Sequence, residues 1–475
     1  MSHERYRLGY HIAPKNGWLN DPNGLCQFRG VYHAFFQFNP MWPAIDTKYW
    51  RHFTSTDLLH WKDVGTSLVT DIAEDRNGVF SGSACVLKGQ ASDGGDLMAL
   101  YYTGNVVDKN DPEAGIDYVH TGREANEILV TSEDGIHFSE KKVLLRNSDY
   151  PEVCTLHVRD PKVWEQDGSV WMLLGARDQH DQGMVLLYGS NDGRTWRIKS
   201  QVYSMNPFGY MWECPNIVQV DGRDFLAVCP QGLPDEVDRW QNLWQAGYFP
   251  LEGSILDTVL VDEKTFVEWD LGYDFYAPQV FVDEQGRTIL IGWMGTFEDN
   301  RTSAPDGMPW AHCLTVPRLL TVGEDGLLRQ NPVPEIEAAR GEAVSLRASK
   351  HVAIDEHRAD IVIEGIKGVG ALTFDDNAVE IAYTGEKLEI SFGGADVAGG
   401  RIDRQVPLSH LDDLRVLVDT SAIEIYANGG ATVFSTRWFP KADMFKVEMG
   451  FKCDRAVMYP MEDAMADAYV DAHEM

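Results

Sequence analysis

The stretch LNDPNGLCQFRGVYHAFFQF, residues 19–38, contains the structural unit from which the fold of this chain can be predicted. Its centre reads as a β-hairpin, because a turn at Gly30 separates two segments rich in apolar and aromatic residues. Asp21 precedes the hairpin, in a run of asparagine, proline and glycine that by itself is typical of a surface turn capped by aspartate. Whether Asp21 only caps a turn depends on what the rest of the chain places beside it.

The hairpin pattern recurs four more times along the chain. The further copies are GGDLMALYYTG from Gly94, QDGSVWMLLGA from Gln166, VDGRDFLAVCPQG from Val220 and EQGRTILIGWMG from Glu284. The turn glycines Gly30, Gly95, Gly168, Gly222 and Gly286 lie roughly 55 to 75 residues apart, which suits one four-stranded sheet and its loops. Periodic glycine and aromatic signatures of this kind favour a five-bladed β-propeller, with a large irregular β-sandwich as the alternative.

A second marker lies between the hairpins. It reads STDLLHW from Ser55, SEDGIHF from Ser132 and SNDGRTW from Ser190, each time a turn followed by an aromatic residue. We predict that each aromatic side chain packs one sheet against the next.

The pattern of residues changes after residue 330, where the hairpin repeat ends. Residues 331–342, NPVPEIEAARGE, read as a proline-broken linker with a short helix, and residues 343–475 alternate short strands with turns such as Asn428-Gly429-Gly430. The predicted fold is therefore all-β, with a five-bladed β-propeller over residues 1–330 followed by a C-terminal β-sandwich. The last residues, 461–475, are compatible with a strand, a helix or a frayed tail.

Composition excludes several function classes. The 475 residues contain 41 Lys plus Arg against 73 Asp plus Glu, a formal net charge of −32, which argues against a nucleic-acid partner. No run approaches the roughly 20 apolar residues of a membrane span, and the start does not resemble a signal peptide, so we expect a cytoplasmic protein without a membrane partner. The seven cysteines show no CxxC spacing, which predicts reduced core thiols and no metal site.

Three carboxylates stand at corresponding places ahead of the turn glycines. The five places are occupied by Asp21, Ser81, Asp160, Glu213 and Tyr276. Each acid alone has an ordinary structural explanation: a turn cap for Asp21, an Arg159 partner for Asp160 and a solvated residue for Glu213. In a propeller, however, the first strand of each blade lines the central channel, so the three acids should meet at one end of it. Like charges at close range raise at least one pKa, an arrangement typical of functional sites.

Two carboxyl groups with separated pKa values are the minimum equipment for cleaving a glycosidic bond. We expect Glu213, beside Trp212 and facing two aspartates, to be the protonated acid, and Asp21, among asparagine and backbone donors, to be the ionised nucleophile. Asp160, held by Arg159, would bind sugar hydroxyls. A nucleophile requires the Asp21 and Glu213 carboxyl groups to lie roughly 5 to 5.5 Å apart.

The motifs WLNDPNG, FSGSA, RDPKVW, MWECPN and DFYAPQ, in this order, resemble those of the β-fructofuranosidases of glycoside hydrolase family 32. The resemblance implies a propeller followed by a sandwich and a retaining reaction on a fructofuranosyl unit, without metal or cofactor. It makes Asp21 the nucleophile, Glu213 the acid/base and Asp160 the transition-state stabiliser. It also implies sugar contacts by Asn20, Gln37, Trp50, Phe80, Ser81, Arg159 and Trp293.

The chain departs from the family pattern at three places around the predicted site. Ile45-Asp46 stand where many relatives have Trp-Gly, Arg51 stands where glycine is usual, and SAPDGMPWAHC, residues 303–313, differs as well. Arg51 is open to two interpretations, a phosphate or leaving-group contact and a surface arginine.

The sequence leaves the small-saccharide substrate open among sucrose, sucrose 6-phosphate and short fructo-oligosaccharides. The alternatives are a fructosyltransferase, an arabinan-cleaving enzyme and a carbohydrate-binding propeller without turnover. A homo-oligomer is also left open.

Overall fold

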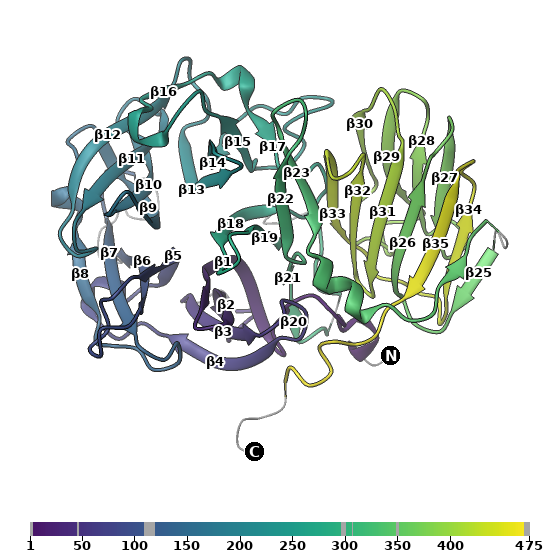
Figure 1. Ribbon diagram of the computed structural model, residues 1–475, viewed down its shortest axis with the longest axis horizontal. Helices are drawn as coiled ribbons and strands as arrows, with labels where there is room; N and C mark the ends of the chain where they lie inside the picture. Colours follow the sequence, from purple (N-terminus) through teal and green to yellow (C-terminus); the bar gives the residue numbers. More distant parts are fainter. Residues whose placement is uncertain are drawn as a thin grey trace.

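The computed structural model describes residues 3–44, 47–108, 119–295, 301–305, 307–347 and 351–469. Figure 1 shows a ring of sheets beside two stacked sheets, a β-propeller followed by a β-sandwich. The predicted all-β fold class is therefore confirmed. No helix in these ranges is long and apolar enough to cross a membrane.

Each of the five propeller sheets is built from strands that follow one another in the chain. Blade one comprises β1 (Gly17–Phe28), β2 (Val31–Asn39), β3 (Tyr49–Ser55) and β4 (Lys62–Leu68), and blade two comprises β5 (Val79–Leu87), β6 (Leu97–Val107), β7 (Arg123–Ser132) and β8 (Lys142–Leu145). Blade three comprises β9 (Cys154–Gln166), β10 (Ser169–Asp178), β11 (Gly183–Ser190) and β12 (Arg197–Ser204), joined by β16 (Leu260–Val261). Blade four comprises β13 (Met211–Val220), β14 (Arg223–Gln231), β15 (Gly247–Pro250) and β17 (Val267–Glu268), and blade five comprises β18 (Tyr276–Val282), β19 (Thr288–Met294), β22 (Arg318–Val322) and β23 (Leu328–Pro332), with β21 (Cys313–Leu314) on β19.

Outside the strands named so far, the described residues of the propeller and the linker form six 3₁₀ turns and one further strand. The 3₁₀ turns are His3–Tyr6, Ala73–Asp75, Asn147–Asp149, Ile255–Asp257, Glu263–Thr265 and Pro334–Ala339, the last within the predicted linker. β20 (Trp310–Ala311), which follows β19 within blade five, pairs in parallel with β1 and so joins blade five to blade one.

The turn glycines explain why the hairpins form. Arg29-Gly30, Asp167-Gly168 and Asp221-Gly222 have positive φ at both positions, the two-residue geometry whose twist matches that of paired strands. In the second repeat the glycine with positive φ is Gly94, not the predicted Gly95, because that turn is longer.

The serine and aspartate of the second marker form the same hydrogen-bonded turn each time. The Asp57, Asp134 and Asp192 carboxylates accept backbone N–H groups two and three residues ahead. The aromatic residue that follows packs on the preceding blade in two of the repeats, with Phe138 6.0 Å from Phe35 and Trp196 6.0 Å from Tyr101 between ring centroids. The predicted locking of one sheet against the next is confirmed for these two.

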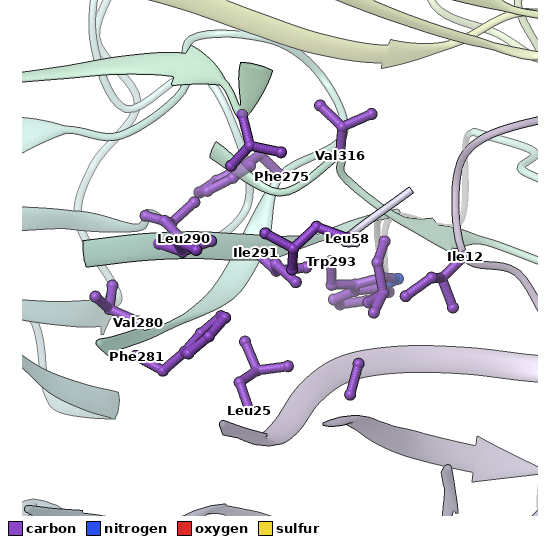
Figure 2. Packing of buried hydrophobic residues seen from close by; sticks show 14 of the residues in the cluster. Ile12, Leu25, Leu58, Phe275, Val280, Phe281, Leu290, Ile291, Trp293 and Val316 are labelled. Carbon is purple, nitrogen blue, oxygen red and sulfur yellow. The ribbon is translucent and has the colours of Figure 1, made fainter. Parts of the chain in front are cut away.

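The first strands of the blades contact one another in a closed ring, in the order β1, β5, β9, β13, β18 and back to β1. Apolar side chains fill the space between neighbouring blades. Figure 2 shows such packing between blade five and the start of the chain, with Phe281, Ile291 and Trp293 near Leu25 and Ile12. The ring therefore holds the five inner strands, and the residues at their starts, around one channel.

The sandwich consists of two six-stranded sheets. One contains β24 (Val344–Ser345), β35 (Arg455–Pro460), β26 (Arg358–Glu364), β31 (Asp413–Asp419), β32 (Ala422–Ala427) and β33 (Thr432–Arg437). The other contains β25 (His351–Ile354), β34 (Phe445–Met449), β27 (Gly370–Phe374), β28 (Val379–Tyr383), β29 (Lys387–Phe392) and β30 (Asp403–Pro407). The predicted hairpin turn at residues 428–430 connects β32 and β33.

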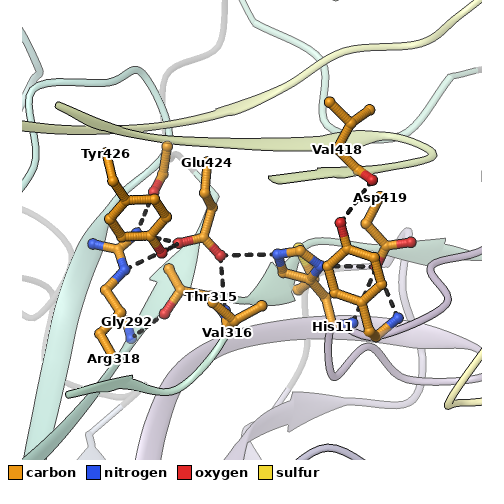
Figure 3. Close-up of polar contacts among 12 residues, drawn as sticks. His11, Gly292, Thr315, Val316, Arg318, Val418, Asp419, Glu424 and Tyr426 are labelled. Carbon is orange, nitrogen blue, oxygen red and sulfur yellow. Dashed lines mark hydrogen bonds and ion pairs between the residues drawn. The ribbon is translucent and has the colours of Figure 1, made fainter. Parts of the chain in front are cut away.

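A buried ionic network joins the propeller to the sandwich (Figure 3). The His11 ring lies between Asp419 and Glu424 of the sandwich, with nitrogen to oxygen distances of 2.8 and 2.9 Å. Arg318 of blade five reaches Glu424 at 2.5 Å and Asp270 at 3.1 Å, and all these side chains are inaccessible to solvent. After the sandwich the chain returns to the propeller, where the Tyr469 hydroxyl donates to the Ala13 carbonyl.

Candidate active site

A β-bulge places the site residues at the start of each inner strand. In β9 the pairing with β10 skips Asp160 and Pro161, in β13 the pairing with β14 skips Cys214 and Pro215, and in β18 it skips Ala277 and Pro278. The first residue of each pair has positive φ. Proline fits here because a bulge needs no ladder donor, and a bulge turns the side chains before it toward the channel.

The bulges correct the predicted alignment of the three acids. Asp160 is the first bulged residue of its strand, as Cys214 is in β13, whereas Glu213 stands one place earlier and corresponds to Arg159. The acids still come from neighbouring inner strands and lie at the same end of the channel, but they are not structurally identical positions.

Asp21 is held by three of the predicted sugar contacts. Its Oδ2 accepts a 2.5 Å hydrogen bond from the Ser81 hydroxyl, and its Oδ1 accepts one from the Asn20 amide at 3.1 Å. The Gln37 side chain links these two donors, because its amide N–H donates to the Ser81 hydroxyl and its carbonyl oxygen accepts from the Asn20 amide, both at 2.7 Å. The nucleophile candidate is thus fixed by a connected polar network from blades one and two.

Glu213 is the most richly hydrogen-bonded carboxylate of the three. Arg159 donates to Oε1 from Nε at 3.1 Å and from Nη2 at 2.7 Å. Oε2 accepts from the Gln231 amide and from the Tyr276 hydroxyl, each at 2.6 Å. The same guanidinium also forms the predicted ion pair with Asp160, at the longer distance of 3.9 Å between Nε and Oδ2, so Arg159 contacts both acids and directs its hydrogen bonds to Glu213.

Cys214 connects the two aspartates. Its backbone N–H donates to Asp160 Oδ2 at 2.9 Å, and its Sγ lies 3.6 Å from Asp160 Oδ2 and 3.9 Å from Asp21 Oδ2. The Asp160 backbone N–H is bound by the Thr103 hydroxyl at 2.9 Å. Because Cys214 directly follows Glu213 in β13, one residue brings all three acids to a common centre.

The pKa values of both buried aspartates of the site are raised. The pKa of Asp160 is raised to about 7, first by burial and also by the charges of Glu213 and Asp21, although the Arg159 charge and the Cys214 N–H lower it. Burial also raises the pKa of Asp21, while Ser81, Asn20 and the Lys48 ammonium lower it. The Asp160 side chain is also less accessible to solvent than that of Glu213, 7% exposed against 16%. The predicted raising of at least one pKa by the assembled acids is confirmed.

Two of the predicted aromatic sugar contacts are inaccessible. The Trp50 and Trp293 side chains are 0% exposed, and the Trp50 indole donates to the Phe80 carbonyl at 3.0 Å. These tryptophans therefore support the site from beneath. Phe80, next to Ser81, is partly exposed, and the Arg123 guanidinium lies 5.5 Å from its ring centroid.

The departures from the family motifs have different outcomes. Arg51 donates two hydrogen bonds to Asp63, at 3.0 and 2.5 Å, so its guanidinium is already occupied within blade one. Ile45 and Asp46 lie outside the described residues. In the segment 303–313, Met308, Trp310 and His312 are buried and pack the end of blade five against blade one.

Four residues of the site went unassigned in the sequence analysis: Tyr276, Gln231, Cys214 and Lys48. Tyr276 had a usable signal, because it occupies the fifth of the five corresponding places. The Lys48 ammonium lies 5.1 Å above the Trp18 ring, and burial lowers its pKa to about 8 although Asp21 opposes this. Lys48 lies near Asp21 because of the conformation of the loop before β3, and no sequence pattern predicted that conformation.

The other end of the channel contains a cavity of about 330 Å³, lined by the later residues of the inner strands and by the buried Lys162. None of the three acids is among the residues that line it. Within the described part of the chain, no group of three or more His, Cys, Asp or Glu side chains is arranged to hold a metal ion.

Comparisons with known proteins agree with the geometry. The model of the glycosyl hydrolases family 32 N-terminal domain matches residues 11–332, and that of the family's C-terminal domain matches residues 391–461. Sucrose-6-phosphate hydrolase of Bacillus subtilis is 35% identical over 457 residues, which are 92% of this chain and 89% of that protein. Raffinose invertase of Escherichia coli is 35% identical over 456 residues, 91% and 90% of the two chains.

Among solved structures, sucrose-6-phosphate hydrolase from Lactobacillus gasseri is similar with a TM-score of 0.84 at 28% identity, covering 97% of this chain and 94% of that one. Both family domains are thus matched, in the expected order. This chain belongs to glycosyl hydrolase family 32 and is a fructoside-hydrolysing enzyme.

Proposed function

We propose that this enzyme cleaves the fructosyl bond of sucrose, sucrose 6-phosphate or short fructo-oligosaccharides with retention, using Asp21 as nucleophile and Glu213 as acid/base. The observation that carries the proposal is the meeting of Asp21, Asp160 and Glu213 around Cys214 at one end of the channel. The names of the relatives support sucrose and its phosphate as substrates.

In the first step Asp21 attacks the anomeric C2 of the fructosyl unit while Glu213 protonates the departing glycosidic oxygen. Asp21 is suited to attack because Ser81 and Asn20 fix both of its oxygens without a cation bound directly to them. Near neutral pH the acids retain a proton between them, and the step requires it on Glu213 when the glycosidic oxygen is bound.

In the second step Glu213, now ionised, activates water, which attacks C2 and releases fructose from Asp21. Arg159, Gln231 and Tyr276 donate four hydrogen bonds to Glu213 and so stabilise its ionised form between the two steps. Asp160 binds fructosyl hydroxyls, and its interaction strengthens as positive charge develops in the sugar ring.

The test is the hydrolysis of sucrose by Asp21→Asn and Glu213→Gln. Each variant should lose at least about 10³-fold in kcat, roughly 4 kcal/mol of barrier, because each removes a group that acts in the transition state. Asp167→Asn is the matched control, since Asp167 is an acid of the β9 hairpin at the far end of the strand. Activity of either catalytic variant close to that of Asp167→Asn would reject the proposed roles.

A further inference from the structure

The Lys48 ammonium lies beside the active site without an ordinary structural partner. Lys48 ends the loop between β2 and β3, and its carbonyl accepts the Val79 backbone N–H at 2.8 Å, which fixes its backbone where blades one and two meet. The residue is partly buried, and within the described part of the chain Nζ donates no hydrogen bond and forms no ion pair with a carboxylate. Burying a charge without such a partner costs free energy, which is typical of groups with a functional role.

The Trp18 ring determines where this ammonium lies. Lys48 Nζ is 5.1 Å from the ring centroid, and His312 packs edge-on against the same ring with 4.2 Å between centroids. The Trp18 indole N–H donates to Asn20 Oδ1 at 3.2 Å, and the Asn20 amide donates to Asp21 Oδ1 at 3.1 Å. The ring that carries the ammonium therefore belongs to the same hydrogen-bonded network as the nucleophile.

The electrostatic partner of Lys48 is Asp21. Burial lowers the pKa of Lys48 to about 8, and Asp21 is the charged group among the described residues that opposes this. In return the Lys48 charge lowers the pKa of Asp21, which burial and Glu213 raise. His312 also lies near Lys48, but it is neutral because burial lowers its pKa well below the usual value. Lys48 therefore stays charged over the acidic range in which Asp21 titrates.

The other ionisable groups around Asp21 supply no positive charge. Those that interact with it are Glu213 and Cys214 of β13, Asp160 of β9 and Cys229 of β14. Burial raises the pKa of the Cys229 thiol, and its hydrogen bond with Cys229 and burial raise that of Cys214, so both thiols stay neutral. The two acids are anions when they ionise and therefore disfavour the charged form of Asp21.

From this arrangement we propose that Lys48 is a positioning residue that keeps the Asp21 carboxylate ionised and ready to attack at acidic pH. The inference rests on the proposed function of Asp21 as nucleophile. A carboxylate attacks only in its ionised form, and burial beside two other acids favours its protonation. An ammonium that acts through space stabilises the negative charge, whereas a direct ion pair would also engage the oxygen that must attack C2.

The first experiment measures kcat/KM for sucrose against pH in the wild-type enzyme, Lys48→Met, Lys48→Arg and the control Lys199→Met. Lys199 of β12 lies 5.0 Å from the centroid of the Trp171 ring in blade three, so its variant removes a ring-bound ammonium from another part of the propeller. Because the Lys48 ammonium is buried without an acceptor among the described residues, a methionine of similar length should not destabilise the fold.

Without the Lys48 charge Asp21 should hold its proton to higher pH. Lys48→Met should therefore lose about 3- to 10-fold in kcat/KM on the acidic limb of the profile and little on the plateau. Lys48→Arg, which keeps the charge, and Lys199→Met should retain the wild-type limb. An unchanged acidic limb in Lys48→Met, or an equal loss at every pH, would overturn the inference.

A direct titration of Asp21 needs no turnover and so separates this inference from the proposed function. In protein labelled with carbon-13 at the aspartate carboxyl groups, the Asp21 resonance is identified by its absence from Asp21→Asn. Its titration should move to higher pH in Lys48→Met and stay in place in Lys199→Met, and a titration that stays in place in both would overturn the inference. Wild-type activity of Asp21→Asn would instead reject the proposed function.

Discussion

Arg159 hydrogen-bonds Glu213 but forms only a longer ion pair with its sequence neighbour Asp160: two nitrogens of its guanidinium lie 2.7 and 3.1 Å from Glu213 Oε1, while its Nε lies 3.9 Å from Asp160 Oδ2. The bulge at Asp160 causes this division, because it turns that side chain toward Cys214 and away from the arginine before it. Glu213 thus accepts hydrogen bonds from the guanidinium, whereas Asp160 is buried at the longer ion-pair distance from the same group.

Replacing Arg159 should therefore impair Glu213 specifically. Arg159→Met removes two charge-assisted hydrogen bonds from the acid/base and should lower kcat on sucrose by about 10²- to 10³-fold. Arg159→Lys should recover only part of this loss, because an ammonium cannot reproduce the two-nitrogen contact. Steady-state kinetics measures both, and a kcat for Arg159→Met within a few-fold of wild type would exclude the assigned role.

Removing the Tyr276 hydroxyl should also lower kcat, but by less than replacing Arg159. Tyr276→Phe keeps the ring but removes the 2.6 Å hydrogen bond to Glu213 Oε2, and we expect kcat to fall about 10-fold while KM changes little. Tyr248→Phe is a suitable control, since its hydroxyl accepts a backbone N–H at the buried base of blade five. Equal kcat values for Tyr276→Phe and Tyr248→Phe would show that the hydrogen bond from Tyr276 to Glu213 does not contribute to catalysis.

Asp160 should make the enzyme less stable as the pH rises. Its pKa is raised from 3.8 to about 7, so the native state binds a proton that the unfolded chain releases, and the free energy of unfolding falls as the pH increases between these values. Asp160→Asn should abolish activity and, at pH 8, raise the free energy of unfolding by on the order of 2–4 kcal/mol relative to wild type. Denaturant unfolding of both proteins at pH 4.5 and pH 8 measures this difference in the free energy of unfolding. A difference between Asp160→Asn and wild type that is no larger at pH 8 than at pH 4.5 would contradict the prediction.

The network between the domains should give a second, alkaline transition. Burial lowers the pKa of His11, but Asp419 and Glu424 together outweigh it and raise that pKa from 6.5 to about 9. The stability that the charged His11 contributes is therefore complete below pH 6.5 and is lost as the pH rises through 9. Wild-type protein should lose about 3 kcal/mol between pH 6.5 and pH 10 from this group. His11→Gln should lack that step, and thermal unfolding across this range would show whether the two proteins differ.

The sequence predicted the fold well because the repeating unit is local. A two-residue turn such as Asp167-Gly168 determines its own hairpin, and the serine and aspartate turns repeat with the same spacing. The three acids could be found for the same reason, since their distances from the turn glycines are nearly equal.

The electrostatics of the site could not be predicted in the same way. Trp212 was expected to make the surroundings of Glu213 apolar, but adjacent residues of a strand point to opposite faces, and Trp212 is fully buried between blades three and four. The donors to Glu213 come from Arg159, Gln231 and Tyr276 on three different strands. Their convergence depends on bulges and blade packing, which single-chain patterns do not encode.

The most direct test of the account is to identify the residue that carries the sugar between the two steps. Glu213→Gln is mixed with β-fructofuranosyl fluoride, whose fluoride departs without a general acid while the second step still lacks its base, and the protein is then quenched, digested and its peptides analysed by mass spectrometry. The account predicts one fructosyl residue attached to the peptide that contains Asp21, and no adduct when Asp21→Asn is added to the same variant. A fructosyl adduct on the Asp160 peptide, or an adduct that persists without Asp21, would contradict it.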